Sequence, residues 1–160
     1  MQRVQKTISE FRYKQGIPEL SARDPVLHAL DLMASHHHDC VLITDGGRVI
    51  GIFTGNDFLH RVAAPHLDPA KTLLGEVMTV HPETLRTRDC VSYAINRMAV
   101  RGFRNVPIVD DDGGQLGVLT VWDVMRHIGE IFDEIDNAPR LVDPASDISS
   151  VTWIDTGGGG

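Results

Sequence analysis

The stretch GIFTGND at residues 51–57 recurs as GVLTVWD at residues 117–123. Both stretches read glycine, two apolar residues, threonine, two variable residues and aspartate. A threonine followed three residues later by an acid is the pattern of a capping box, which begins a helix. The apolar residues before it are typical of a strand. Each stretch therefore predicts a strand that runs directly into a helix, and its recurrence predicts a repeated unit.

The repeat extends well beyond these two stretches. Arg23 aligns with Arg88 at an offset of 65 residues, and a loop longer by one residue moves the offset to 66 before Gly51 and Gly117. Twelve positions are identical across the two copies. In the first copy they are Arg23, Asp24, Val26, Ala29, Met33, Ala34, Val41, Ile43, Asp45, Gly51, Thr54 and Asp57. Conserved order over this length indicates a duplication.

Each copy has the same expected layout of strand, helix, strand, strand and helix. Asp24 and Asp89 are predicted as the N-caps of the first helices, with Pro25 at the first helical position. Apolar strands are expected over residues 40–44 and 49–53, and over residues 106–109 and 116–119, each pair joined by a turn rich in Asp and Gly. The second helices begin near Asp57 and Asp123, and the later one carries an apolar stripe over residues 124–135.

The predicted fold class is α/β (α+β), with two pseudo-two-fold related β-α-β-β-α motifs packed sheet to sheet. The first motif is expected over residues 8–64, the second over residues 72–135, and a partly flexible tail over residues 136–160. A unit of about sixty residues buries little surface alone, so the two copies are expected to share one core. Pairing of this kind creates clefts between the copies, where small ligands usually bind.

Composition narrows the possible partners. The net charge of −7 disfavours binding to nucleic acid or to an anionic membrane surface. No stretch has the roughly 18 uncharged apolar residues of a membrane span, and the first residues lack the apolar core of a secretory signal. We therefore expect a cytoplasmic protein. Cys40 and Cys90 are isolated and are interpreted as small buried thiols.

The duplicated pattern resembles the tandem cystathionine-β-synthase (CBS) domain pair, also called the Bateman module. The resemblance covers roughly residues 8–132. It is carried by the two Gly-apolar-apolar-Thr-x-x-Asp stretches, by RNVPIVD at residues 104–110 and by EVMT at residues 76–79, which is expected to open the second copy. It implies a non-catalytic regulatory module that assembles as a homodimer and signals to an unknown regulated protein.

The resemblance also implies a ligand and its contacts. Many CBS pairs bind AMP, ADP or ATP, and some bind S-adenosylmethionine or an NAD-type ligand. No cofactor is obligatory. In the family the motif aspartate binds the ribose hydroxyls and the threonine contacts ribose or phosphate. The chemistry agrees, because a carboxylate can accept two hydrogen bonds from a vicinal diol and a helix N-terminus offers free N–H groups to a phosphate.

Crossing the two copies yields two candidate sites. Site one comprises Ile52, Phe53, Thr54, Asp57, Met78, Glu83, Thr84, Arg104, Asn105 and Pro107. Site two comprises Val118, Leu119, Thr120, Asp123, Pro18, Glu19, Asp39, Cys40 and Val41. Arg104 would attract phosphates in site one, whereas Asp39, its aligned residue, would repel them in site two. Site one is thus favoured for a phosphorylated ligand, and site two is expected to be empty or to hold an uncharged or cationic adenosine derivative.

Two departures from the family pattern bear on affinity. Relatives commonly have Glu-Arg between the motif threonine and aspartate, and the arginine assists phosphate binding. This chain has Gly55-Asn56 there. Trp122 occupies the equivalent place in the second copy. It is interpreted either as a contact to a base or as a core or dimer contact.

Several alternatives stay open. The two Thr-x-x-Asp boxes also fit helix caps that bind nothing. The chain could be a structural dimerisation module whose clefts are closed by Phe53, Leu119 and Trp122. The triplet His36-His37-His38 suggests a metal, but adjacent residues do not easily converge on one ion, so a solvated turn without a metal is the preferred interpretation. No catalytic triad, Cys–His pair or P-loop is present, so an enzyme is not predicted.

Overall fold

The computed structural model describes residues 6–136, with side chains over residues 6–130. The chain divides into two compact units, residues 1–126 and 127–160. Both sheets lie in the first unit. The predicted tail of residues 136–160 and the stripe residues beyond position 130 lie outside the described side chains.

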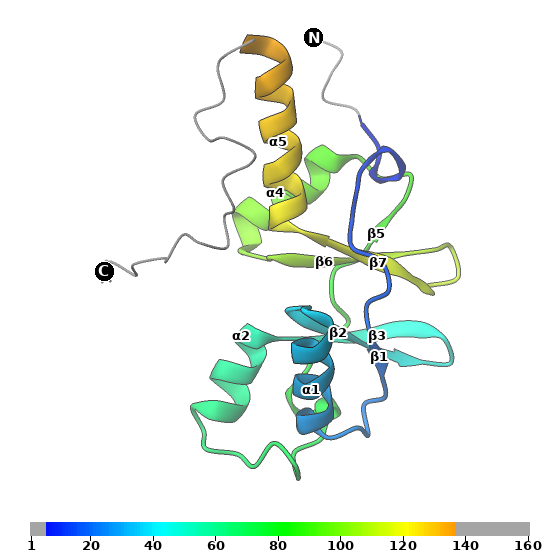
Figure 1. Ribbon diagram of the computed structural model, residues 1–160. Coiled ribbons are helices and arrows are strands. Elements are labelled where there is room, and N and C mark those ends of the chain that lie inside the picture. The colour runs from blue at the N-terminus through cyan, green and yellow to red at the C-terminus, as the bar shows by residue number, and fades with distance from the viewer. Residues whose placement is uncertain (1–5, 137–160) are drawn as a thin grey trace, which may run out of the picture. The chain divides into compact units, whose positions relative to one another are not determined.

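The first copy forms a sheet with the strand order β1-β2-β3-β4 (Figure 1). Strand β1 runs parallel to β2, and β2 and β3 form an antiparallel hairpin. The elements are β1 (Glu19–Leu20), α1 (Val26–His36), β2 (Cys40–Asp45), β3 (Arg48–Thr54), α2 (Gly55–Phe58) and a short π-helix (Leu59–Ala63). The predicted order of strand, helix, strand, strand and helix is confirmed.

The second copy repeats this arrangement in a three-stranded sheet, β5-β6-β7. Its strands again comprise one parallel and one antiparallel pair. The elements are β5 (Leu85–Arg86), α4 (Val91–Arg101), β6 (Asn105–Val109), β7 (Gln115–Thr120) and α5 (Val121–Asp136). Three short elements precede the copies: η1 (Ile8–Glu10) before the first, and α3 (Leu74–Val77) with β4 (Thr79–Val80) before the second.

Strand β2 is buried on both of its faces, which explains its continuous apolar run. Val41 and Ile43 pack into a cluster with α1, whereas Cys40 and Leu42 on the opposite face pack against Val118 of the second sheet. Successive side chains of a strand point to opposite faces. One face therefore contacts the covering helix and the other contacts the second sheet. The sheet-to-sheet packing predicted from the repeat is confirmed, and Figure 1 shows α1 and α2 outside the first sheet and α4 outside the second.

The first copy is completed by the segment that precedes the second copy. The Val26 N–H donates to the Thr72 carbonyl at 2.9 Å, and the Leu74 N–H donates to the Asp24 carbonyl at 2.9 Å. Strand β4 then pairs with the edge of β3. The segment EVMT, expected to open the second copy, thus contributes a strand and buried side chains to the first sheet.

Residues 6–14 make the equivalent contacts on the second copy. The Val91 N–H donates to the Lys6 carbonyl at 2.9 Å, and the Ile8 N–H donates to the Asp89 carbonyl at 2.9 Å. The two segments occupy matching positions 66 residues apart, so the duplication begins earlier than the sequence alignment indicated. Each copy thus bonds to the segment that precedes the other copy in the chain, and we call these the borrowed segments: residues 72–80 for the first copy and residues 6–14 for the second. These contacts join the two copies.

The repeated glycine of each motif lies where the borrowed segment crosses the sheet. A Cβ at Gly51 would overlap the Met78 thioether, and a Cβ at Gly117 would overlap the Lys14 backbone carbonyl. Lys14 also exchanges two backbone hydrogen bonds with Val118, of 3.1 and 2.8 Å. Glycine at position 117 permits the close approach of two backbones, and glycine at position 51 leaves room for the Met78 side chain.

The predicted starts of the first helices are wrong by one residue. Helix α1 has Pro25 as its N-cap residue and α4 has Cys90, neither with a side-chain cap. Asp24 instead accepts a 2.7 Å hydrogen bond from the Ser21 N–H, and Asp89 makes the same bond in the second copy. These carboxylates stabilise the turn that leads from the short strand into the helix.

The two cysteines differ in exposure. Cys40 is buried as predicted, but Cys90 is exposed at the start of α4, so the second half of that prediction is wrong. Burial raises the pKa of the Cys40 thiol to about 12, with the nearby Asp39 carboxylate acting in the same direction.

Candidate functional site

Both predicted capping boxes form. The Thr54 hydroxyl accepts from the Asp57 N–H at 3.2 Å, and Asp57 Oδ2 accepts from the Thr54 N–H and hydroxyl at 2.9 Å each. Thr120 and Asp123 repeat these bonds at 3.2, 2.8 and 2.7 Å. Both aspartates are buried. One carboxylate oxygen in each copy is thus used to begin the second helix.

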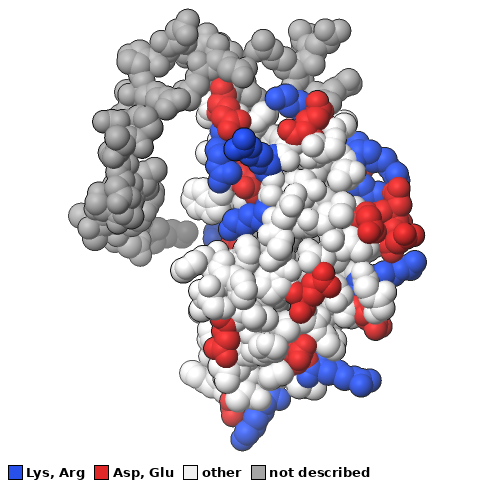
Figure 2. Space-filling view, turned by 45° about the vertical axis from the view of Figure 1, so that its right-hand side comes forward, with Lys and Arg blue, Asp and Glu red and all other residues white. Residues whose placement is uncertain are grey.

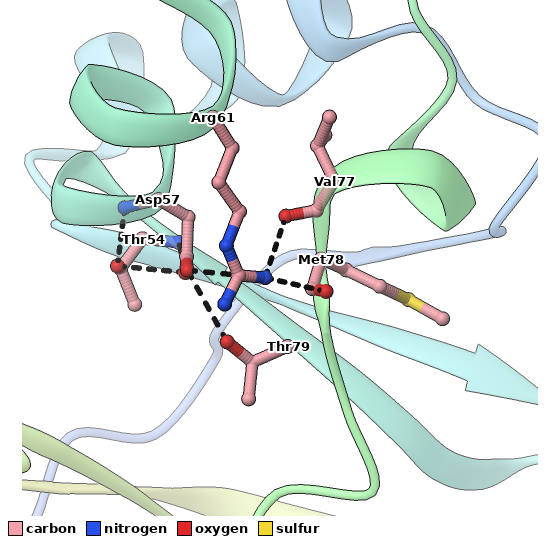
Figure 3. Close-up of polar contacts among 6 residues, drawn as sticks. All are labelled: Thr54, Asp57, Arg61, Val77, Met78 and Thr79. Carbon is pink, nitrogen blue, oxygen red and sulfur yellow. Dashed lines mark hydrogen bonds and ion pairs between the residues drawn. The ribbon is translucent and has the colours of Figure 1, made fainter.

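The other oxygen of Asp57 is engaged by two groups (Figure 3). The Thr79 hydroxyl donates to Asp57 Oδ1 at 3.2 Å, and Arg61 Nη1 lies 3.6 Å from the same oxygen. The Arg61 guanidinium also donates to the Val77 carbonyl at 3.0 Å and to the Met78 carbonyl at 2.8 Å. Arg61 therefore connects the helical segment after Thr54 to the borrowed segment of β4.

The other oxygen of Asp123 has a simpler environment. Arg126 Nη1 lies 3.5 Å from Asp123 Oδ1, and its side chain is 59% exposed. The residue aligned with Thr79 is Tyr13, which donates no hydrogen bond to Asp123. The ion pair with Arg126 is the side-chain contact that the described residues 6–130 provide to Asp123 Oδ1. The two motif aspartates are thus alike at Oδ2 and different at Oδ1.

The starts of strands β2 and β6 meet between the two copies. The Gly55 N–H donates to the Asp39 carbonyl at 3.2 Å, and the Val121 N–H donates to the Arg104 carbonyl at 2.9 Å. The Asn105 amide lies 3.5 Å from Asp39 Oδ2. Asn105 was predicted for site one and Asp39 for site two, but the structure places these two side chains next to each other.

The remaining residues of predicted site one are divided. Met78 lies against Gly51, but Glu83 forms an ion pair with Arg97 at 2.8 Å and accepts from the Tyr93 hydroxyl at 2.9 Å. Glu83 is therefore engaged with α4. Ile52, Phe53 and Pro107 are buried, Thr84 is half-buried and Arg104 is exposed.

Predicted site two is divided in the same way. Glu19 accepts from the Gln115 amide at 2.7 Å and from the Thr44 hydroxyl at 3.2 Å, and the Pro18 carbonyl accepts from the Leu42 N–H at 3.0 Å. These contacts connect β1 with both hairpins. Val118, Leu119, Cys40 and Val41 are buried in the core. Their side chains therefore belong to the core that positions the strands, and they are not exposed to a ligand.

Trp122 is 67% exposed on the first turn of α5, whereas Phe53 and Leu119 are fully buried. These three side chains therefore do not close the clefts together, as the structural-module alternative required. Trp122 does not belong to the core either. Its exposure leaves a contact to another molecule as the role to be tested.

The histidine triplet forms the end of α1. His36 closes the helix, His37 is in the left-handed conformation with a φ of 53°, and His38 is half-buried. Burial, with help from Lys14, lowers the pKa of His38. No group of three metal-ligating side chains occurs among the described residues.

A cavity in the described part of the chain lies away from these residues. It measures about 190 Å³ and is lined by Arg86, Thr87, Arg88, Val109, Asp110, Asp111 and Leu116. These residues lie at the ends of β6 and β7 opposite to Asn105 and Thr120. Asp111 forms ion pairs with Arg86 at 3.3 Å and with Arg88 at 2.8 Å. Because its charges are already paired, we assign this cavity no role in the candidate site.

Arg61 and Thr79 are the contacts that the sequence analysis missed. Arg61 follows Asp57 by four residues, which is the spacing of an ion pair on one helix face, so a search for such pairs would have found it. Thr79 is 22 residues away from Asp57, and nothing local indicates their contact.

Two matching sheets, each with a Thr–Asp box at the start of its second helix, define a tandem-repeat α/β module. The family model of the CBS domain matches residues 14–64 and 74–130. The chain therefore belongs to the CBS domain family and contains a pair of these domains.

Relatives agree with this assignment. The chain is 34% identical over 125 residues to the meiotically up-regulated gene 70 protein of Schizosaccharomyces pombe, covering 74% of this chain and 17% of that protein. It is 34% identical over 131 residues to the CBS domain-containing protein CBSCBSPB3 of Arabidopsis thaliana, covering 81% and 23%. The chain thus spans about a fifth of the length of these curated relatives.

Solved structures share the fold. A putative signal-transduction protein with CBS domains from Burkholderia ambifaria has a TM-score of 0.72 at 20% identity, covering 84% of this chain and 96% of that one. The CBS domain pair of protein MJ0100, in complex with 5′-methylthioadenosine and S-adenosyl-L-methionine, scores 0.70 at 23%, covering 79% and 98%. CBSX2 in complex with AMP scores 0.64 at 21%, covering 79% and 98%.

Within residues 6–136, no helix combines the length and the apolar character needed to cross a membrane.

Proposed function

We propose that this chain is a non-catalytic, cytoplasmic regulatory module that binds an adenosine nucleotide of the AMP, ADP or ATP class between its two CBS domains. Binding is proposed to alter the contacts of the module with a regulated protein, because a ligand shifts a conformational equilibrium only by its differential affinity for the two states. CBS domain pairs are typically regulatory modules.

The observation that carries the proposal is the contact between Asn105 and Asp39. It brings the starts of β2 and β6 together, beside the two helix starts at Gly55 and Val121. Both Thr–Asp boxes thereby border one region between the sheets. A ribose diol and a phosphate are recognised by carboxylate oxygens and by amides at helix starts, and both kinds of group are concentrated here.

Two of the structural relatives support the class of ligand. One was solved with AMP, and the other with 5′-methylthioadenosine and S-adenosyl-L-methionine. All three ligands contain adenosine. Sensing of S-adenosylmethionine or NAD(H) is therefore the nearest variant of the proposal.

Titration calorimetry on the full chain tests the proposal. AMP, ADP and ATP are expected to bind, and S-adenosylmethionine and NADH are the comparison ligands. The double variant Asp57→Asn with Asp123→Asn is the matched control, because asparagine still caps a helix but carries no charge. We expect the control to bind at least tenfold more weakly. Absence of binding to the unaltered chain at millimolar concentration would overturn the proposal.

The exposed apolar side chains support assembly as a homodimer, the most direct way to cover them. Trp122 is 67% exposed, Met125 56% and Val100 70%. Basic and acidic groups are mixed over the face shown in Figure 2, and this distribution does not favour nucleic acid. Sedimentation analysis of the full chain and of the Trp122→Glu variant tests the dimer. Monomers at every concentration would exclude it.

A second candidate function is a structural dimerisation module without a ligand. The engagement of Asp57 by Thr79 and Arg61 favours this function, because the group expected to bind ribose is already bonded within the chain. The same titration separates the two functions.

A further inference from the structure

The two motif aspartates are chemically equivalent in sequence but differ in the bonds they have already made. Each uses Oδ2 for its own helix cap. What distinguishes them is Oδ1, the oxygen left for a ligand. If the proposed function holds, the protein contacts of this one atom decide which of the two domains binds the ribose.

Displacing the partners of Asp57 is costly. A ribose hydroxyl donating to Asp57 Oδ1 would compete with the Thr79 hydroxyl at 3.2 Å and with the Arg61 cation at 3.6 Å. Moving Arg61 aside would also remove its bonds to the carbonyls of Val77 and Met78 (Figure 3). A partly buried carbonyl without a donor is unfavourable, so these contacts reinforce one another.

Asp123 has no comparable set of partners in the described side chains. Its Oδ1 is approached by Arg126, at 3.5 Å, from a long side chain that is mostly in solvent. Asp123 itself is buried, with 4% of its side chain exposed, and this ion pair is the one described contact that holds the Arg126 guanidinium, so the arginine can move aside without breaking bonds to other groups. The residue aligned with Thr79 is Tyr13, whose ring packs on Gly117. The residue aligned with Arg61 is His127, a shorter side chain 3.3 Å from Glu130.

We infer that the motif aspartates of the two CBS domains have different roles. Asp57 is structural: through Thr79 and Arg61 it connects the start of α2 to the borrowed segment, and we call these contacts the tie. Asp123 is the carboxylate that binds the ribose. The chain then takes one nucleotide, at the second motif. Arg61 and Thr79 are the positioning residues that set this preference. The sequence favoured site one because of Arg104, but the bonds at Asp57 Oδ1 oppose that choice.

The first test compares the two aspartates by titration calorimetry with AMP on the full chain. We expect one site per chain, at least tenfold weaker binding for Asp123→Asn, and less than a twofold change for Asp57→Asn. In the Arg61→Met variant, Asp57 loses its tie and a second site is expected. Two sites in the unaltered chain, or weaker binding only in Asp57→Asn, would overturn the inference.

The second test needs no ligand and separates the inference from the proposed function. Arg61→Met is expected to lower the melting temperature by about 4 °C or more, because three contacts are lost. The matched variant Arg126→Met, which removes the ion pair to Asp123, is expected to shift it by less than about 1 °C. Equal shifts would refute the tie whether or not a nucleotide binds. Unequal shifts without any nucleotide binding would support the tie and overturn the proposed function.

Discussion

The two CBS domains share a fold, a capping box and a borrowed segment, yet they differ where that segment crosses the sheet. In the first domain the segment contributes Thr79 and Met78, which bond to Asp57 and pack on Gly51. In the second domain it contributes Tyr13 and Lys14, which pack on Gly117. The backbone arrangement tolerates both, because the repeated glycine accepts either neighbour. Divergence after duplication has therefore changed the surroundings of the motif aspartate and left its cap intact.

The largest expected difference between the domains concerns the two glycines. Gly117→Ala places a Cβ on the Lys14 backbone carbonyl, which is held by two hydrogen bonds and cannot move alone. We expect a loss of about 3 kcal/mol in the free energy of unfolding. Gly51→Ala meets the flexible Met78 side chain, and about 1 kcal/mol is expected. Urea denaturation measures both, and equal losses would contradict the comparison.

A smaller difference is expected for the side chains that approach the two aspartates. Thr79→Val removes the hydroxyl that donates to Asp57 while keeping the shape, and we expect a loss of about 1.5 kcal/mol. Tyr13→Phe, its counterpart, removes a hydroxyl that makes no bond to Asp123 and is expected to change stability by less than about 0.5 kcal/mol. Thermal denaturation of the two variants provides the measurement, and a larger effect of Tyr13→Phe would reverse the assignment.

The smallest expected effect separates the two thiols. At pH 8 a thiol reagent should label Cys90 rapidly and leave Cys40 unlabelled in the native chain, since Cys40 is buried and its pKa is raised to about 12. Labelling is counted by mass spectrometry, with the denatured chain as the control for two reactive thiols. Rapid double labelling of the native chain would contradict the burial of Cys40.

The raised pKa of Cys40 also gives a direction for alkaline stability. A folded pKa above the unfolded value means that the unfolded chain releases this proton first as the pH rises. The contribution of Cys40 to stability is therefore complete below the unfolded thiol pKa and declines as the pH approaches about 12. The variant Cys40→Ala should lack this part of the alkaline decline.

Much of the fold could be read from local pattern. The strand preceding Thr54 and the helix following it are dictated by a run of apolar residues and a capping box, and both lie close together in the chain. The apolar run of β2 also predicted a buried strand, because a strand buried on both faces needs no polar residue. The N-caps were predicted wrongly at Asp24 and Asp89, because each of these carboxylates bonds to the preceding turn and not to the helix.

The duplication could be predicted because identical residues recur in the same order along the chain, and the strand and helix order and the two Thr–Asp boxes because each depends on residues within one turn or one hairpin. The contacts of the second oxygen of each aspartate, by contrast, became visible only in the folded chain. Thr79 reaches Asp57 because the segment before the second domain pairs with the first sheet, and that pairing joins residues far apart in the chain. Long-range pairing of this kind is set by the burial of whole faces, which no single stretch of sequence records.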